Sequence, residues 1–220
     1  VSKHKLSFKE INDRINELLK QSIKSEGVIN LFSDIKEKFS LFDEKFLKEI
    51  SQMKEKNLAV EILNKLIAEQ VKLYKNTNYV RAEKFSEILS NAMSNYLKGL
   101  LTNEQVIDEL IKTAQSIING EKDSKELNLS NEELAFYDAI SKPEAAKDFY
   151  SNEQLVTITK ELTDMLRKNK TIDWNRKESA RAGMRMLVKK LLKKYKYPPE
   201  GEDYALETVM KQCELWSENN

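Results

Sequence analysis

The stretch TIDWNRKESARAGMRMLVKKLLKKYKYPPE, residues 171–200, places apolar and basic residues with the period of an α-helix. With residues about 100° apart around the axis, seven side chains share an apolar arc of roughly 140°. They are Ala180, Met184, Leu187, Val188, Leu191, Leu192 and Tyr195. Asp173 can cap this helix, and Pro198 and Pro199 must end it. The stretch therefore predicts a helix with one face in a core and a basic face outside.

The composition of the whole chain extends this prediction to the fold class. Of 220 residues, 33% are charged and 40% hydrophobic, and there are only 5 Gly and 3 Pro. Few helix breakers among many Lys, Glu, Leu and Ile favour an all-α fold. We expect an irregular multi-helix domain of about ten helices, without a fixed-period repeat. Two helical subdomains are expected, over 1–100 and 101–220.

Helix starts and stops are predicted from capping signals. A Ser or Thr followed three residues later by Glu or Gln forms a capping box. Gly120 is expected to end one helix, the polar segment 120–128 to form a loop or linker, and Pro143 to lie in a first helical turn. Helices are expected over about 79–100 and 202–217. Capping boxes are expected at Ser7, Thr102, Ser130 and Ser151.

Charge is distributed unevenly along the chain, although the net charge is only +1. Residues 161–199 hold twelve Lys/Arg against four Asp/Glu, whereas residues 200–220 hold one Lys against six acids. No acidic residue lies between Glu178 and Glu200, so pairs one turn apart cannot neutralise the basic face from within its own helix. The acidic tail after Pro199 can neutralise it only by folding back.

Most catalytic sites are excluded by missing residues. There is no phosphate-binding G-x-x-x-x-G-K-[ST] loop, and a single histidine, His4, is a poor metal ligand alone. The lone cysteine, Cys213, has no histidine near it in sequence and is expected to be a small buried residue. Phe136 and Tyr137 have the spacing of core residues. No catalytic, cofactor-binding or metal-ligating residue is predicted.

Two further observations concern the chain's context. No apolar run of about 18 residues is present, so no transmembrane helix and no membrane partner are expected. A single cysteine excludes an intrachain disulfide and fits a reducing cytosol. The sequence begins with Val1 rather than Met, so a piece of a longer protein is expected.

The basic face of the 171–200 stretch has three open interpretations. It is a solvated surface, a docking surface for an acidic protein, or a contact for DNA phosphates. A membrane contact is disfavoured because the apolar arc is needed for the core. Arginine recognises anions with a more specific geometry than lysine. Arg176, Arg181 and Arg185 are therefore preferred as partner or DNA contacts over Lys189, Lys190, Lys193 and Lys194.

Three motifs in order resemble one known family. LSNEELAFYDA (129–139), IDWNRKESARA (172–182) and LVKKLLKKYKYPP (187–199) are similar to the C-terminal helical domain of the R (HsdR) subunit of type I restriction–modification enzymes. With ALETVMKQCEL (205–215) after them, the motifs occur in order over about ninety residues, and KFSEIL (84–89) resembles an upstream helix of the family. The resemblance adds Trp174, Glu178 and Arg181 as motif positions. A structural role is also expected for two of them, because Trp174 can pack at the helix start and Glu178 can pair with Arg181 one turn on.

The resemblance implies a role in a larger enzyme. The R subunit of this family carries a nuclease domain and an ATP-driven DNA translocase, and its helical domain docks on a methyltransferase core of M and S subunits. The implied partners are therefore the M and S subunits, and DNA in the assembled complex, in the bacterial cytoplasm. The parent subunit is expected to use ATP and Mg²⁺, whereas these 220 residues are expected to hold no cofactor and no catalytic activity. The alternative function is a helical module that grips the DNA backbone during translocation.

Overall fold

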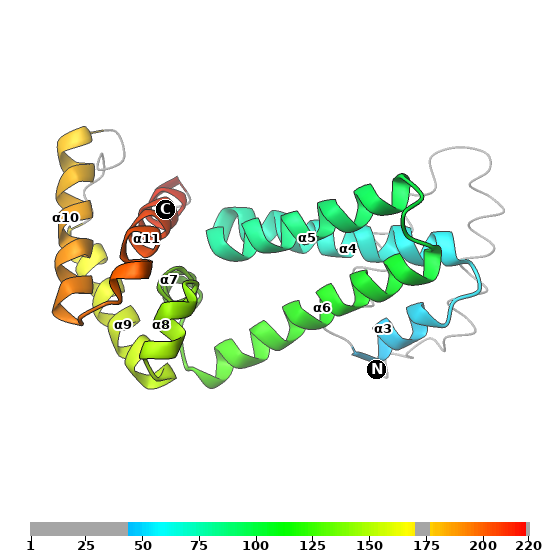
Figure 1. Ribbon diagram of the computed structural model, residues 1–220, viewed down its shortest axis with the longest axis horizontal. Coiled ribbons are helices and arrows are strands. Elements are labelled where there is room, and N and C mark those ends of the chain that lie inside the picture. Colours follow the sequence, from blue (N-terminus) through cyan, green and yellow to red (C-terminus); the bar gives the residue numbers. More distant parts are fainter. Residues whose placement is uncertain (1–43, 170–176, 219–220) are drawn as a thin grey trace, which may run out of the picture. The chain divides into compact units, whose positions relative to one another are not determined.

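The computed structural model describes residues 44–169 and 177–218, and every regular element within those ranges is an α-helix. The all-α prediction is confirmed. Figure 1 shows the elements in chain order. They are α3 (Glu44–Ser51), α4 (Lys56–Thr77), α5 (Tyr79–Leu97), α6 (Asn103–Glu126), α7 (Asn131–Ser141), α8 (Glu144–Phe149), α9 (Asn152–Asn169), α10 (Glu178–Lys194) and α11 (Pro199–Glu218).

The described residues form two compact units. The first unit contains 44–67 and 92–118, and the second contains 68–91 and 119–218 apart from 170–176. The chain passes between the two units three times, within α4, α5 and α6, so each of these helices contributes residues to both units. The subdomains proposed over 1–100 and 101–220 stay a prediction.

The core of the second unit is built by α7, α9, α10 and α11, which pack on one another (Figure 1). Phe136 and Cys213 are buried in this unit, as the sequence predicts, and Tyr137 packs partly buried against it. The rings of Phe136 and Trp216 pack in a T-shaped arrangement, 6.0 Å between centroids and 88° between planes, a favourable geometry for two aromatic rings.

Helix starts follow the predicted capping boxes wherever the structure describes them. At α7, the Ser130 hydroxyl accepts a hydrogen bond from Glu133 N, and the Glu133 carboxylate accepts one from Ser130 N. This exchange satisfies two backbone donors that a helix start otherwise leaves free. The box predicted at Ser7 lies outside the described residues. The confirmed boxes are Thr102 with Gln105, Ser130 with Glu133, and Ser151 with Gln154.

The predicted stop at Gly120 is wrong, and so is most of the loop over 120–128. Helix α6 continues through Gly120 to Glu126, and the chain turns only at Asn128, where φ is 51°. A glycine costs a helix only about 1 kcal/mol, which is too little to end one that is held by tertiary contacts. Here the Arg81 guanidinium lies 3.6 Å from the position of a Cβ on Gly120, so the glycine marks a close approach of a side chain.

Candidate functional site

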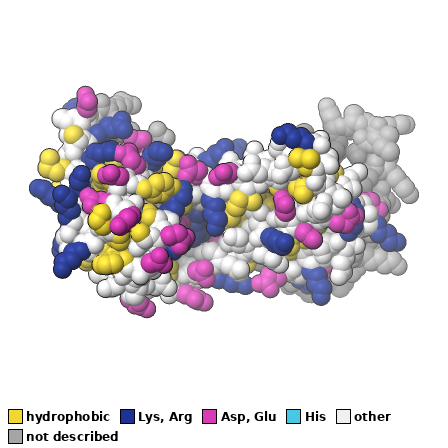
Figure 2. Space-filling view, in the orientation of Figure 1, with side chains coloured by type: hydrophobic (Ala, Val, Ile, Leu, Met, Phe, Trp, Pro, Cys, Tyr) yellow, Lys and Arg dark blue, Asp and Glu magenta, His cyan; other side chains and the backbone are white. Residues whose placement is uncertain are grey.

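Helix α10 is oriented by its apolar arc, as the sequence predicts. Met184, Val188, Leu191 and Leu192 are buried, and the other members of the arc are partly buried. The proline pair fits the prediction too, because α10 ends at Lys194 and α11 begins at Pro199. With this arc in the core, the basic residues of α10 face outward. Figure 2 shows Lys and Arg side chains gathered over this helix, with Asp and Glu among them.

The two described arginines of the basic face are held by α11. Arg181 Nη2 donates to Glu214 Oε1 at 2.5 Å, and Arg185 forms an ion pair with Glu207. The tail after Pro199 therefore folds back and neutralises part of the basic face. Side chains in these pairs are 36 to 53% exposed, so water screens them and each contributes at most about 1 kcal/mol.

Lys194 is held by another helix of the same unit. Its Nζ donates to Glu161 of α9 at 2.5 Å, and the Tyr195 hydroxyl donates to the second carboxylate oxygen at 2.6 Å. These hydrogen bonds lower the pKa of Glu161 and raise the pKa of Lys194. Lys194 is thus a structural contact between α9 and α10 as well as a surface charge.

The remaining lysines of α10 form the open part of the face. Lys189, Lys190 and Lys193 are exposed, and within the described ranges none of them takes part in an ion pair. On a helix with about 100° per residue, Met186 falls inside the arc spanned by these lysines. The Met186 side chain is 59% exposed. We call these four residues the lysine face.

Two of the sequence-predicted contacts, Trp174 and Arg176, lie outside the described residues. For the others the structure reverses the order of preference. Arg181 and Arg185 already have carboxylate partners, whereas three of the four lysines do not. All eight residues stay predictions as contacts for a partner or DNA, because no ligand or partner chain is present.

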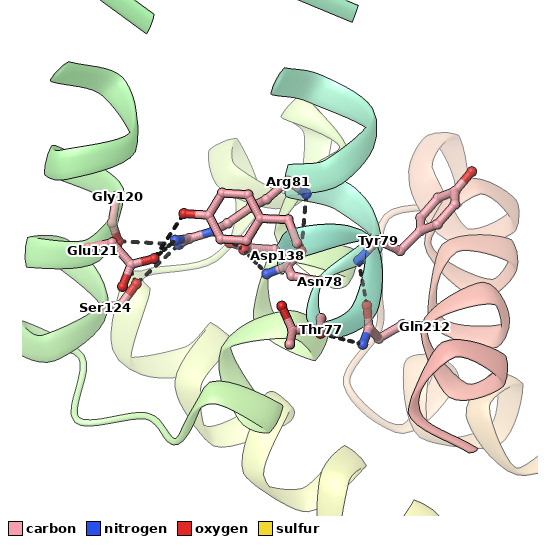
Figure 3. Close-up of polar contacts among 10 residues, drawn as sticks. Thr77, Asn78, Tyr79, Arg81, Gly120, Glu121, Ser124, Asp138 and Gln212 are labelled. Atoms are coloured by element: carbon pink, nitrogen blue, oxygen red, sulfur yellow. Dashed lines mark hydrogen bonds and ion pairs between the residues drawn. The ribbon is translucent and has the colours of Figure 1, made fainter. Parts of the chain in front are cut away.

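A polar cluster around Arg81, which the sequence reading missed, joins three helices of the second unit (Figure 3). Arg81 Nε donates to Asp138 Oδ2 of α7 at 2.7 Å, and Nη1 donates to Glu121 Oε1 of α6 at 3.2 Å. Nη2 donates to the Gly120 carbonyl at 3.2 Å and to the Ser124 hydroxyl at 3.1 Å. Burial acts to lower the pKa of Arg81, but the Asp138 carboxylate outweighs it and raises that pKa. We call this set the Arg81 cluster.

The break between α4 and α5 is fixed from two sides of the same unit. Asn78 donates from Nδ2 to Asp138 Oδ2 at 2.7 Å and accepts from Arg81 N through Oδ1 at 3.1 Å. Gln212 of α11 accepts from Tyr79 N at 2.8 Å and donates to the Thr77 carbonyl at 3.0 Å (Figure 3). The Gln212 amide thus replaces helix hydrogen bonds that the break removes.

The sequence does contain one signal for this cluster. Asp138 stands within LAFYDAI, where Phe136, Ala139 and Ile140 are fully buried. A carboxylate among buried neighbours requires a cation or several donors. From this requirement one could predict that a cation from another helix pairs with Asp138, but not that the cation is Arg81.

The end of α5 and the turn that leads to α6, in the first unit, carry the most exposed large apolar side chains of the described residues. Leu97 is 80% exposed and Leu100 is 69% exposed. Gly99 has φ 73°, and the turn is closed by hydrogen bonds from Gly99 N to Tyr96 O at 3.0 Å and from Leu100 N to Asn95 O at 2.9 Å. The left-handed φ favours glycine, so this turn is locally well specified.

The described ranges contain neither a metal-site cluster nor a helix that could span a membrane. No group of three or more His, Cys, Asp or Glu side chains there has the arrangement of a metal site. None of the described helices is long and apolar enough to cross a membrane.

Comparison with known proteins gives one consistent family. Residues 1–219 match the family model described as type I restriction enzyme HindI endonuclease subunit-like, C-terminal. The chain is 39% identical over 209 residues to the type I restriction enzyme HindI endonuclease subunit of Haemophilus influenzae, covering 93% of this chain and 20% of that protein. It is 29% identical over 203 residues to a putative type I restriction enzyme MjaIXP endonuclease subunit of Methanocaldococcus jannaschii, covering 90% of this chain and 19% of that protein. The chain thus spans about a fifth of the length of these curated relatives. No solved structure matches it significantly.

Proposed function

The chain belongs to the type I restriction enzyme HindI endonuclease subunit-like family, as its C-terminal part, and we propose that it is an assembly domain. In this proposal it docks the ATP-dependent translocase and nuclease of the R subunit onto the methyltransferase core of M and S subunits. The match over 1–219 is the observation that carries the proposal. We propose that the parent subunit binds ATP and Mg²⁺ through other parts of the protein. The segment described by the 220 residues would serve assembly in the bacterial cytoplasm and have no catalytic activity of its own.

The turn between α5 and α6 is the docking surface that we propose. Its backbone is fixed by the hydrogen bonds at Gly99 and Leu100, and the Tyr96 hydroxyl donates to Asn103 Oδ1 at 2.8 Å. A turn held in this way loses little conformational entropy when it binds. Two leucines on a preorganised turn suit an apolar depression on a partner protein, because removing their side chains from water lowers the free energy of the complex.

The magnitude follows from the exposed side chains. Burying one leucine fully is worth roughly 1.5 to 3 kcal/mol. Replacing Leu97 and Leu100 by serine should therefore weaken docking by about 3 kcal/mol or more, which is over a hundredfold in Kd. Both side chains are exposed in the chain alone, so the same change should leave its stability within about 0.5 kcal/mol.

The test is co-migration of the 220-residue chain with purified M and S subunits in size-exclusion chromatography at micromolar concentration. We expect a complex with the wild-type chain and none with L97S/L100S. The matched control is L73S, because Leu73 is also exposed, at 59%, but lies on α4 in the second unit. A folded wild-type chain that does not co-migrate refutes the assembly role, and equal effects of both variants refute the assignment of the turn.

A further inference from the structure

We propose that the lysine face of α10 contacts the phosphate backbone of duplex DNA, without sequence preference. Lys189, Lys190 and Lys193 supply the charges, whereas the charges of Arg181 and Arg185 are offset by carboxylates of α11. This inference goes beyond the assembly role and does not depend on it. The assembly surface lies in the first unit and the lysine face in the second.

The charge of this face is complementary to an anionic partner. Three exposed lysines occupy an arc of about 100° on a single helix, within little more than one turn. Like charges so close together repel one another when no carboxylate lies between them. No acidic residue of the described chain pairs with them, and the carboxylates of Glu207 and Glu214 are taken by the two arginines. An external polyanion would relieve this repulsion.

The use of lysine favours DNA over an acidic protein. Lysine is depleted in protein–protein interfaces, where arginine is enriched because its planar fork makes specific paired hydrogen bonds. On this face the arginines are committed internally, and the outward charges are flexible ammonium groups. Such groups suit phosphates, which position a protein on DNA and carry no sequence information.

Salt dependence gives the expected magnitude. For duplex DNA, the slope of log K against log salt is about −0.9 for each phosphate neutralised. Three lysines therefore predict a slope of about −2.7, or about a 40-fold loss of affinity between 50 and 200 mM salt. Binding should be weak, with Kd on the order of 10⁻⁴ M at physiological salt, because only one helix contributes.

The experiment is fluorescence anisotropy of a labelled mixed-sequence duplex titrated with the 220-residue chain over that salt range. We expect K189Q/K190Q/K193Q and K189E/K190E/K193E to lose the salt-dependent binding. Circular dichroism should be unchanged, because the three side chains are exposed. The matched control replaces three exposed lysines on different helices by glutamate, so its net charge changes by the same amount as in K189E/K190E/K193E. They are Lys125, Lys147 and Lys160.

Two outcomes overturn the proposal. Equal losses in the clustered and dispersed variants would mean that the duplex responds to net charge and not to the lysine face. The second is the absence of duplex binding by the wild-type chain at 50 mM salt. Loss of M and S co-migration in K189E/K190E/K193E would then assign the lysines to a protein partner. The variant M186K separates the two partners further. A fourth charge should steepen the slope toward about −3.6 for DNA, whereas loss of the exposed Met186 would weaken an interface with a protein.

Discussion

Replacing Arg81 by methionine should destabilise the second unit more than any change at an exposed ion pair. Methionine keeps an unbranched side chain that can fill the space of the arginine stem. The guanidinium is lost, and with it the bonds to Asp138, Glu121, the Gly120 carbonyl and Ser124. The change leaves a carboxylate of α7 without its cation in a site from which water is largely excluded.

The magnitude follows from burial. The Arg81 and Asp138 side chains are only 11% and 18% exposed, and removal of one partner from a buried pair costs about 3 to 5 kcal/mol. Asp138 keeps the amide of Asn78 as a donor, and Glu121 is 34% exposed and therefore solvated. The lower end of the range applies, so we expect a loss of about 3 kcal/mol. With an m value of about 2 kcal/mol/M, the urea midpoint falls by roughly 1.5 M.

The assay is urea unfolding followed by the fluorescence of Trp216, which packs against the core of the second unit. The second tryptophan, Trp174, is replaced by phenylalanine in all variants so that one signal remains. The matched control is R185M, because the ion pair of Arg185 and Glu207 is about half exposed and should contribute less than about 1 kcal/mol.

Two results would refute this reasoning. One is a loss below about 1 kcal/mol in R81M, or a loss equal to that of R185M. The other concerns the double variant R81M/D138L, which removes the stranded carboxylate as well. It should cost clearly less than the sum of the two single changes, because an unpaired buried charge is the main penalty. Simple additivity would show that Arg81 and Asp138 do not act as a pair.

Two further predictions concern packing and pH. In G201A the added Cβ would lie 2.8 Å from Cβ of Pro143, a ring atom that cannot rotate away, so a loss of about 1 to 3 kcal/mol is expected. Gly183 lies within α10 with nothing within 4 Å of its Cβ position, so G183A should instead gain about 0.5 to 1 kcal/mol; thermal unfolding of both variants checks the opposite signs. Burial, and then the charge of Glu121, raises the pKa of Tyr74 from 10.0 to about 12. Between these values the unfolded chain loses the phenolic proton while the folded chain keeps it. Stability that is fully present below pH 10 is therefore lost as the pH rises toward 12, by on the order of 2 kcal/mol. Urea midpoints measured across that window should fall less steeply in Y74F, and an unchanged slope would contradict the assignment.

The elements that the sequence predicted correctly depend on neighbouring residues. The boxes at Thr102, Ser130 and Ser151 each involve residues three positions apart, and the apolar arc of α10 repeats within single turns. Gly120 shows the limit of this local reasoning, because a helix held by tertiary contacts continues through a residue of low propensity.

The sequence by itself determined the helical class, the helix starts at the boxes of Thr102, Ser130 and Ser151, and the identity of the basic helix, because those properties depend on composition and on contacts a few residues apart. It did not determine the starts of α10 and α11, which lie at Glu178 and Pro199. Only the tertiary structure decided which charges of the basic helix have a carboxylate partner among the described residues. Arg181 meets Glu214 across 33 residues, and Arg81 meets Asp138 across 57, so neither pair has a local signal. Arginine and lysine look alike in a charge count. They differ here because α11 brings carboxylates to the two arginines and leaves Lys189, Lys190 and Lys193 without a partner among the described residues.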